Sequence, residues 1–118
     1  RGKINMEIVT VTFADDNIGN TVNEGCIFFE KSVKPLVTDE TKELQFGLEA
    51  DLISPSFLLG VFMNVIDLYI VGRGDNDVKV SFDDPKVYAF FGTVAAAFSA
   101  TLDMATDIEE EQEQDFLS

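Results

Sequence analysis

The sequence contains no histidine, and Cys26 is its only cysteine. Without histidine the chain lacks the commonest general base, the usual acyl-transfer triad and the ligand of most zinc sites. One cysteine permits no intramolecular disulfide, which is typical of a protein in a reducing compartment, so we expect a cytoplasmic location. The sequence also lacks a phosphate-binding glycine-rich loop that ends in Lys-Ser/Thr and a dinucleotide fingerprint. We therefore predict a protein that is not an enzyme and that uses no metal and no cofactor.

Basic residues are few as well. Eight lysines and arginines stand against 22 aspartates and glutamates, which gives a net charge of −14. Because binding to nucleic acids and to anionic membranes depends on Lys and Arg, this charge argues against both kinds of partner. The apolar stretch Phe57–Val71 has 15 residues, whereas a helix needs about 20 residues to cross a bilayer. We expect this stretch to form a buried helix.

The length and the charge distribution indicate one domain followed by an acidic tail. A chain of 118 residues with 46% hydrophobic residues can bury a core without disulfides or metals. Between Asp103 and the C-terminus there are seven acidic residues and no basic one. We therefore assign residues 1–106 to an α/β domain and residues 107–118 to an acidic C-terminal tail.

Strand-like and helix-like hydrophobic patterns alternate along the chain. Apolar residues occupy every second position in the first kind of segment and recur every three or four positions in the second. The predicted strands cover residues 6–13, 43–50 and 78–82, and the predicted helices cover residues 21–34, 55–69 and roughly 85–102. The order β-α-β-α-β-α favours a sheet with parallel strand pairs joined by crossover helices.

The clearest boundary is the start of the second predicted helix, at Ser54-Pro55-Ser56. A hydroxyl residue before a proline matches an N-cap followed by proline at the first helical position, so we expect Ser54 to cap the helix. Ser56 then occupies the second helical position, where backbone N–H groups are unpaired and a phosphate would be stabilised. Ser56 is therefore a candidate phosphorylation site. Its alternative role is that of a small polar residue that helps to start the helix.

The remaining acidic motifs predict turns rather than chemistry. The pairs Asp15-Asp16 and Asp83-Asp84 lie at expected turns, where adjacent carboxylates usually serve as solvated caps. The segment 75–77 lacks the glycine and the distal glutamate that a calcium loop requires. We predict neither a catalytic carboxylate pair nor a metal site.

Two segments resemble a known family. The segment LISPSFLLG (residues 52–60), which opens a hydrophobic helix after a strand, resembles the STAS superfamily of anti-sigma-factor antagonist domains, and especially its STAS-like branch with a Ser-Phe pair at this turn. The segment IGNTVNEG (residues 18–25) is similar to the glycine-bracketed entry to the first helix in that branch. The resemblance covers roughly residues 6–100. It implies an α/β fold with a mixed, partly parallel sheet of about four strands and helices packed mainly on one face. It also implies a phosphorylation switch at Ser56, and a partner that is often a serine kinase or ATPase of the histidine-kinase-like type.

We therefore expect a STAS-like interaction domain of bacterial or phage-related signalling that binds a protein partner, with homodimerisation left open. Two alternatives come from other classes. A small-molecule or nucleotide-binding sensor would use the same helix N-terminus as an anion site, and an acidic inhibitor or decoy would act through the tail. The predicted docking face combines the start of the second helix with the loop before the first helix, and its residues are Ser54, Pro55, Ser56, Phe57, Leu58, Asn17, Asn20 and Asn23.

Overall fold

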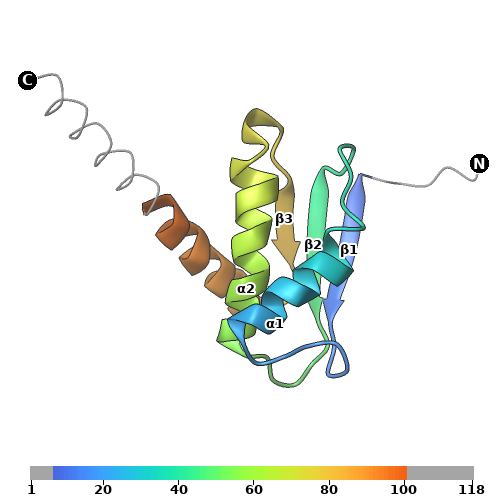
Figure 1. Ribbon diagram of the computed structural model, residues 1–118, viewed down its shortest axis with the longest axis vertical. Coiled ribbons are helices and arrows are strands. Elements are labelled where there is room, and N and C mark those ends of the chain that lie inside the picture. Colours follow the sequence, from blue (N-terminus) through green and yellow to red (C-terminus); the bar gives the residue numbers. More distant parts are fainter. Residues whose placement is uncertain (1–6, 101–118) are drawn as a thin grey trace, which may run out of the picture.

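The computed structural model describes residues 7–100, and these residues follow the predicted alternation of strands and helices (Figure 1). The three strands are β1 (Ile8–Phe13), β2 (Glu43–Leu48) and β3 (Lys79–Phe82). Helix α1 (Val22–Phe28) continues into a π-helical segment, η1 (Phe29–Val33), and α2 (Pro55–Val65) continues into a second one, η2 (Ile66–Val71). A short 3-10 helix, η3 (Gly74–Asn76), precedes β3, and a last helix over residues 85–100 follows it. The predicted tail at residues 107–118 lies outside the described residues.

The strands form one sheet in the order β1-β2-β3, and both strand pairs are parallel. Helices α1 and α2 cover the same face of this sheet, which confirms the predicted α/β class with helices mainly on one face (Figure 1). The expected mixed sheet of about four strands differs in detail, since residues 7–100 form three strands and all of them are parallel. The reason is the connectivity: a helix follows each strand, whereas an antiparallel neighbour usually arises from a tight hairpin.

Alternate strand residues face the helices and build an aromatic core. The rings of Phe13, Phe46 and Phe82 stack in a row across the sheet, with centroid distances of 5.4 Å between the first two and 5.7 Å between the last two. Phe62 of α2 meets Phe46 and Phe82 edge-on, at 5.4 and 5.7 Å. Phe91 packs edge-on against Phe62 at 5.2 Å, so the last helix belongs to the same core.

The opposite face of the sheet carries polar residues and is covered by no helix of the described chain. Glu43 Oε2 accepts hydrogen bonds from Gln45 Nε2 and from Ser81 Oγ, both at 2.9 Å. The Thr10 hydroxyl donates to Gln45 Oε1 at 3.3 Å, so the network spans all three strands. The bond from Gln45, followed by that from Ser81, holds the pKa of Glu43 below its usual value because both donors favour the charged carboxylate.

Helices α1 and α2 cross with their backbones in contact, at Gly25 and Gly60. A Cβ atom on Gly25 would overlap the carbonyl oxygen of Phe57, and one on Gly60 would overlap the carbonyl oxygen of Val22. Any other residue at either position would therefore push the helices apart. Asn64 Nδ2 donates to the Gly60 carbonyl at 2.8 Å beside the crossing.

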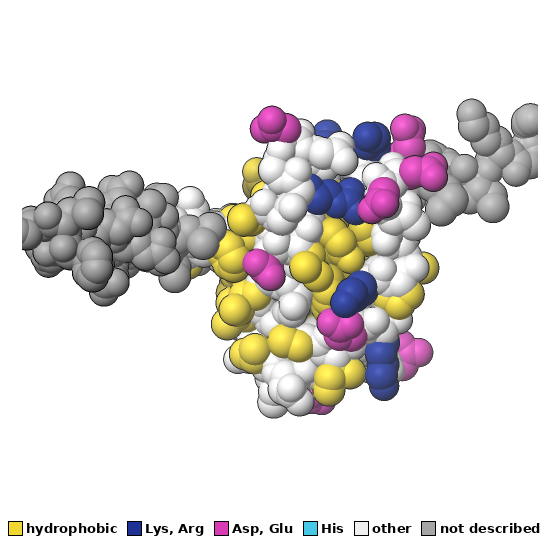
Figure 2. Space-filling model, turned by 45° about the horizontal axis from the view of Figure 1, so that its top comes forward, with side chains coloured by type: hydrophobic (Ala, Val, Ile, Leu, Met, Phe, Trp, Pro, Cys, Tyr) yellow, Lys and Arg dark blue, Asp and Glu magenta, His cyan; other side chains and the backbone are white. Residues whose placement is uncertain are grey.

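The apolar stretch that was predicted to be a buried helix forms α2 and η2. Its inward residues include Val61, Phe62 and Val65, which are fully buried, whereas Met63 and Leu68 remain exposed. Figure 2 shows that apolar side chains also gather on the surface where the last helix joins the body. Within residues 7–100, no helix has the length and apolar character that a membrane crossing requires.

Arg73 follows η2 and makes contacts that hold this end of the helix in place. Its guanidinium donates to the carbonyl oxygens of Thr41 and Thr38, at 3.0 and 2.7 Å. The same group lies over the ring of Tyr69, 5.4 Å from the centroid, which is a cation–π contact. The end of η2 is thereby tied to the loop that leads into β2.

Candidate functional site

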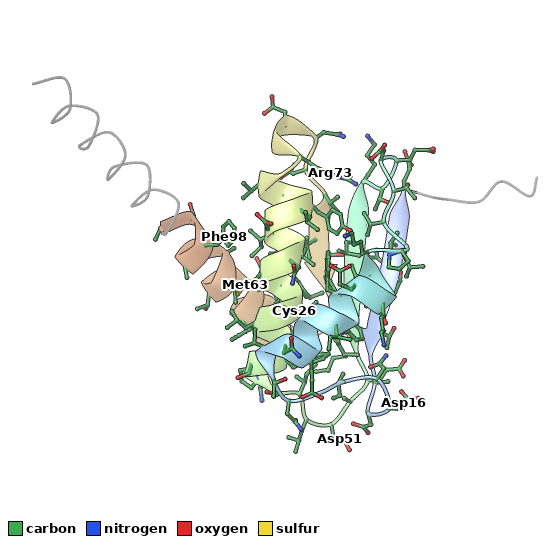
Figure 3. All side chains as sticks on the ribbon, viewed as in Figure 1. Asp16, Cys26, Asp51, Met63, Arg73 and Phe98 are labelled. Carbon is green, nitrogen blue, oxygen red and sulfur yellow. The ribbon has the colours of Figure 1, made fainter. Side chains whose placement is uncertain are left out.

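Three loops meet at the carboxyl edge of the sheet, which is where open parallel sheets usually bind their ligands. They are the β1–α1 loop (residues 14–21), the β2–α2 loop (residues 49–54) and the short link after β3 (residues 83–84). Figure 3 shows Asp16 and Asp51, from the first two loops, at the same end of the molecule. Both predicted docking segments lie at this edge.

In the β1–α1 loop, Asn17 has a structural role. Its Oδ1 accepts a hydrogen bond from the Ala14 backbone N–H at 2.9 Å, and its Nδ2 donates to the Thr12 carbonyl at 3.0 Å. The side chain therefore closes the turn that follows β1. Asn23, another predicted docking residue, is exposed on α1.

Side chains of the same segment bond the backbone N–H groups at the start of α1. Thr21 Oγ1 accepts a hydrogen bond from the Glu24 backbone N–H at 3.1 Å, while Glu24 Oε1 accepts from the Asn20 N–H at 3.0 Å and from the Thr21 hydroxyl at 3.1 Å. This arrangement is a capping box displaced by one residue. The backbone N–H of Asn20, and after it the Thr21 hydroxyl, lower the pKa of Glu24.

The start of α2 differs from the prediction in one respect. Ser54 is the N-cap residue and Pro55 follows it at the start of the helix, as expected, but the Ser54 hydroxyl makes no capping bond. It donates instead to the Asn20 carbonyl at 3.0 Å. The hydroxyl is thus turned toward the neighbouring loop and accepts no N–H from the first turn of α2. The two predicted docking segments are thus joined directly, and Ser56 is exposed beside them.

Phe57 and Leu58 are almost fully buried, in contrast to the other predicted docking residues, although Leu58 still lines a groove at this edge. Their exposed fractions are 1% and 4%. The Phe57 ring packs against Phe28 at 5.4 Å and against Phe13 at 6.1 Å. Because the sequence of α2 is apolar on nearly every side, its pattern did not reveal which residues face the core.

The exposed apolar residue at this edge is Leu52, which the sequence analysis did not select. Its side chain is 85% exposed, although its neighbour Ile53 packs partly against the core. Leu52 borders an open groove of about 420 Å³ between the β2–α2 loop and the start of the last helix. The groove is lined by Leu48, Asp51, Leu52, Ile53, Pro55, Leu58, Asp84, Lys86, Val87 and Phe90. Leu52 and Ile53 are adjacent apolar residues in the same loop, so the sequence carries no signal that distinguishes the exposed side chain from the partly buried one.

The charged residues of this edge divide into structural and exposed groups. Asp83 Oδ1 accepts from the Leu48 N–H at 3.0 Å, and Asp84 Oδ2 caps the last helix by accepting from the N–H groups of Lys86 and Val87 at 3.0 and 2.9 Å. The cap role predicted for this acidic pair is confirmed for Asp84, whereas Asp83 bonds to the neighbouring strand β2. Asp51 remains exposed on the rim of the groove. Among residues 7–100, no three His, Cys, Asp or Glu side chains come close enough to hold a metal ion.

Comparison with known proteins found no family model, no curated protein and no solved structure that matches this chain.

Proposed function

We propose that this chain is a non-catalytic protein-interaction domain whose docking surface is the Leu52 groove. The observation that carries the proposal is the exposure of Leu52 beside an open, partly apolar groove at the carboxyl edge of the sheet. Exposed apolar anchors that border a pocket and are rimmed by polar groups are typical of protein-binding surfaces. The lining of the groove is apolar with Asp51, Asp84 and Lys86 as its charged residues, so acids outnumber bases and suit a partner that presents an apolar side chain next to a basic residue.

The proposed docking surface replaces part of the predicted one. Pro55 lines the groove, and Ser54, Ser56 and Asn20 lie at the neighbouring end of α2. Leu58 lines the groove although it is largely buried, Phe57 belongs to the core, and Leu52 supplies the exposed apolar contact.

Phosphorylation of Ser56 is the proposed switch. Ser56 is exposed, and no side chain caps the start of α2, so the helix dipole and its N–H groups would favour a phosphate there. The added charge would lie next to a groove that already carries Asp51 and Asp84, and it would change the attraction for a basic partner. The proposed partner class, a serine kinase or ATPase of the histidine-kinase-like type, and the STAS-like relationship rest on the sequence resemblance alone.

The test is affinity capture from cells of the source organism, with Leu52→Asp compared with the unchanged chain. Leu36→Asp is the matched control, because Leu36 is also an exposed leucine (51%) in a loop, but it lies between η1 and β2, away from the carboxyl edge. We expect a specific partner to be lost with Leu52→Asp and retained with Leu36→Asp. Equal capture by both variants would exclude the groove as the docking surface. Ser56→Asp, measured in the same series, tests the switch separately.

A further inference from the structure

Within residues 7–100, strand β1 forms one edge of the sheet, and the strand itself carries none of the usual protection against further pairing. Its six residues, IVTVTF, are all β-branched or aromatic and none is charged. Such residues have the highest preference for strands. Natural edge strands are usually short, charged, bulged or interrupted by proline. The register between β1 and β2 runs without a bulge from Ile8 to Phe13, so β1 is regularly paired over its whole length.

The opposite edge, formed by β3, is protected. This strand has four residues and contains Lys79, whereas β1 has six residues and none of them is charged. Phe82 at its end is in contact with the last helix through Phe91, at 5.1 Å. The unprotected edge is therefore a specific property of β1.

The backbone of β1 presents hydrogen-bonding groups to this edge. The Phe13 carbonyl accepts from the N–H groups of the two residues that follow β2, at 2.9 and 3.0 Å. In a parallel ladder, alternate residues bond to the same neighbour, so the N–H and C=O groups of Ile8 and Thr10 point away from β2. In the described part of the chain no strand lies on that side. The Thr12 carbonyl is bound by Asn17 Nδ2, which sets the end of the available edge.

Side chains around β1 indicate which kind of segment could pair with this edge. Ile8, 41% exposed, is the large apolar strand residue that the described fold leaves uncovered. Asp15 and Asp16 follow β1, are exposed, and form no ion pair with a base among residues 7–100. A second copy of this chain would bring its own Asp15 and Asp16 and a further net charge of −14, so repulsion opposes self-pairing.

We propose that the β1 edge binds an extended segment of another protein by strand addition. The segment pairs antiparallel to Ile8–Thr12, has β-branched residues at alternate positions, and carries Lys or Arg at its N-terminal end, opposite Asp15 and Asp16. This surface is separate from the Leu52 groove, so either proposal can fail while the other holds.

The test is an NMR titration of the full, ¹⁵N-labelled chain with the acetylated peptide KKVTVTVTG. We expect amide shift changes concentrated between Ile8 and Thr12. Replacing both Asp15 and Asp16 by Asn should weaken binding about five- to tenfold, as the loss of two exposed charge pairs predicts. Leu52→Asp should have no effect. The same peptide N-methylated at every valine and threonine has no backbone N–H in that stretch to donate to an edge and should not bind.

A variant of the edge completes the test. Thr10→Pro removes an N–H that points away from β2, so the ladder to β2 remains while strand addition is blocked. The proposal is wrong if the N-methylated peptide binds as well as the parent, or if the peptide shifts no amide of β1. It is also wrong if β1 is protected by concentration-dependent dimerisation without peptide, because the occupant is then a second copy. The N-methylated peptide decides the question even if Thr10→Pro does not fold.

Discussion

The two faces of the sheet are built from the same strands, and neighbouring residues contribute to them in different ways. In β2, Phe46 is buried among other rings, whereas Gln45 beside it belongs to the polar network on the open face. The covered face is stabilised by ring packing and by the exclusion of water. The open face is held by hydrogen bonds that water can replace. The covered face therefore determines the fold, and substitutions on the open face should leave the fold intact.

The largest loss of stability is expected from a substitution on the covered face. Phe46→Ala should lower the free energy of unfolding by about 3–5 kcal/mol, because it removes a buried ring and leaves a cavity between its neighbours. Phe46 is buried and its ring contacts those of Phe13, Phe62 and Phe82. Urea denaturation followed by circular dichroism measures the change. A loss below about 1 kcal/mol would mean that the core repacks around the missing ring.

The next largest loss of stability is expected where the two helices that cover this face cross. Gly60→Ala should lower the free energy of unfolding by about 1–3 kcal/mol, since the added methyl group overlaps the Val22 carbonyl of α1. Gly92→Ala is the matched control, because a Cβ atom at Gly92 meets nothing within 4 Å. Gly92→Ala should raise the free energy of unfolding by up to about 1 kcal/mol, because alanine favours a helix more than glycine does. Equal effects of the two substitutions in thermal or urea unfolding would contradict the backbone contact at the crossing.

On the open face, Gln45→Ala should change the free energy of unfolding by less than about 1 kcal/mol. Gln45 bonds to Glu43 and Thr10, and both groups can turn to water once the amide is removed. The same urea titration gives the value beside that of Phe46→Ala, its neighbour in the chain. A loss as large as that of Phe46→Ala would show that this face is buried in the folded protein under the conditions used.

The smallest expected effect on stability comes from the ionisation of Glu43 on the open face, and it depends on pH. Hydrogen bonds from Gln45 and Ser81 lower the pKa of Glu43, so the ionised carboxylate stabilises the fold at neutral pH. This contribution should be present above the pKa of Glu43 in the unfolded chain and disappear as the pH falls through its lower folded pKa. Glu43→Gln should flatten the profile of stability against pH in that acidic range. An unchanged slope would show that the network does not favour the charged form.

Much of the fold could be predicted from the sequence, because each element carries a strong local pattern. The alternation in β1 and the spacing of apolar residues in α1 predicted their type, and Pro55 and Pro85 marked the helix starts. The contact between Gly25 and Gly60 was not predictable, since it joins two helices whose relative position only the folded chain defines. The hydrophobic pattern predicted three strands with parallel pairs, as the structure has, while the mixed sheet of about four strands came from the family resemblance.

The candidate site was predicted less completely. The sequence indicated that the segments of Asn20 and Ser54 are adjacent, and the hydrogen bond between them confirms it. It did not reveal that Phe57 is buried, because an almost wholly apolar helix has no polar side to orient it. Leu52 was missed because it stands next to another apolar residue, Ile53, and nothing in this sequence shows that the loop leaves Leu52 in solvent.

The crossing at Gly25 and Gly60 also bears on how the molecule moves. Side chains that separate two helices can change rotamer and let the helices slide, but a direct backbone contact has no such adjustable layer. Helices α1 and α2 should therefore open together, with amide hydrogen exchange that reports one shared free energy for both. A force applied at the first turn of α2 would reach α1, and through it the β1–α1 loop, as the displacement of a single rigid body.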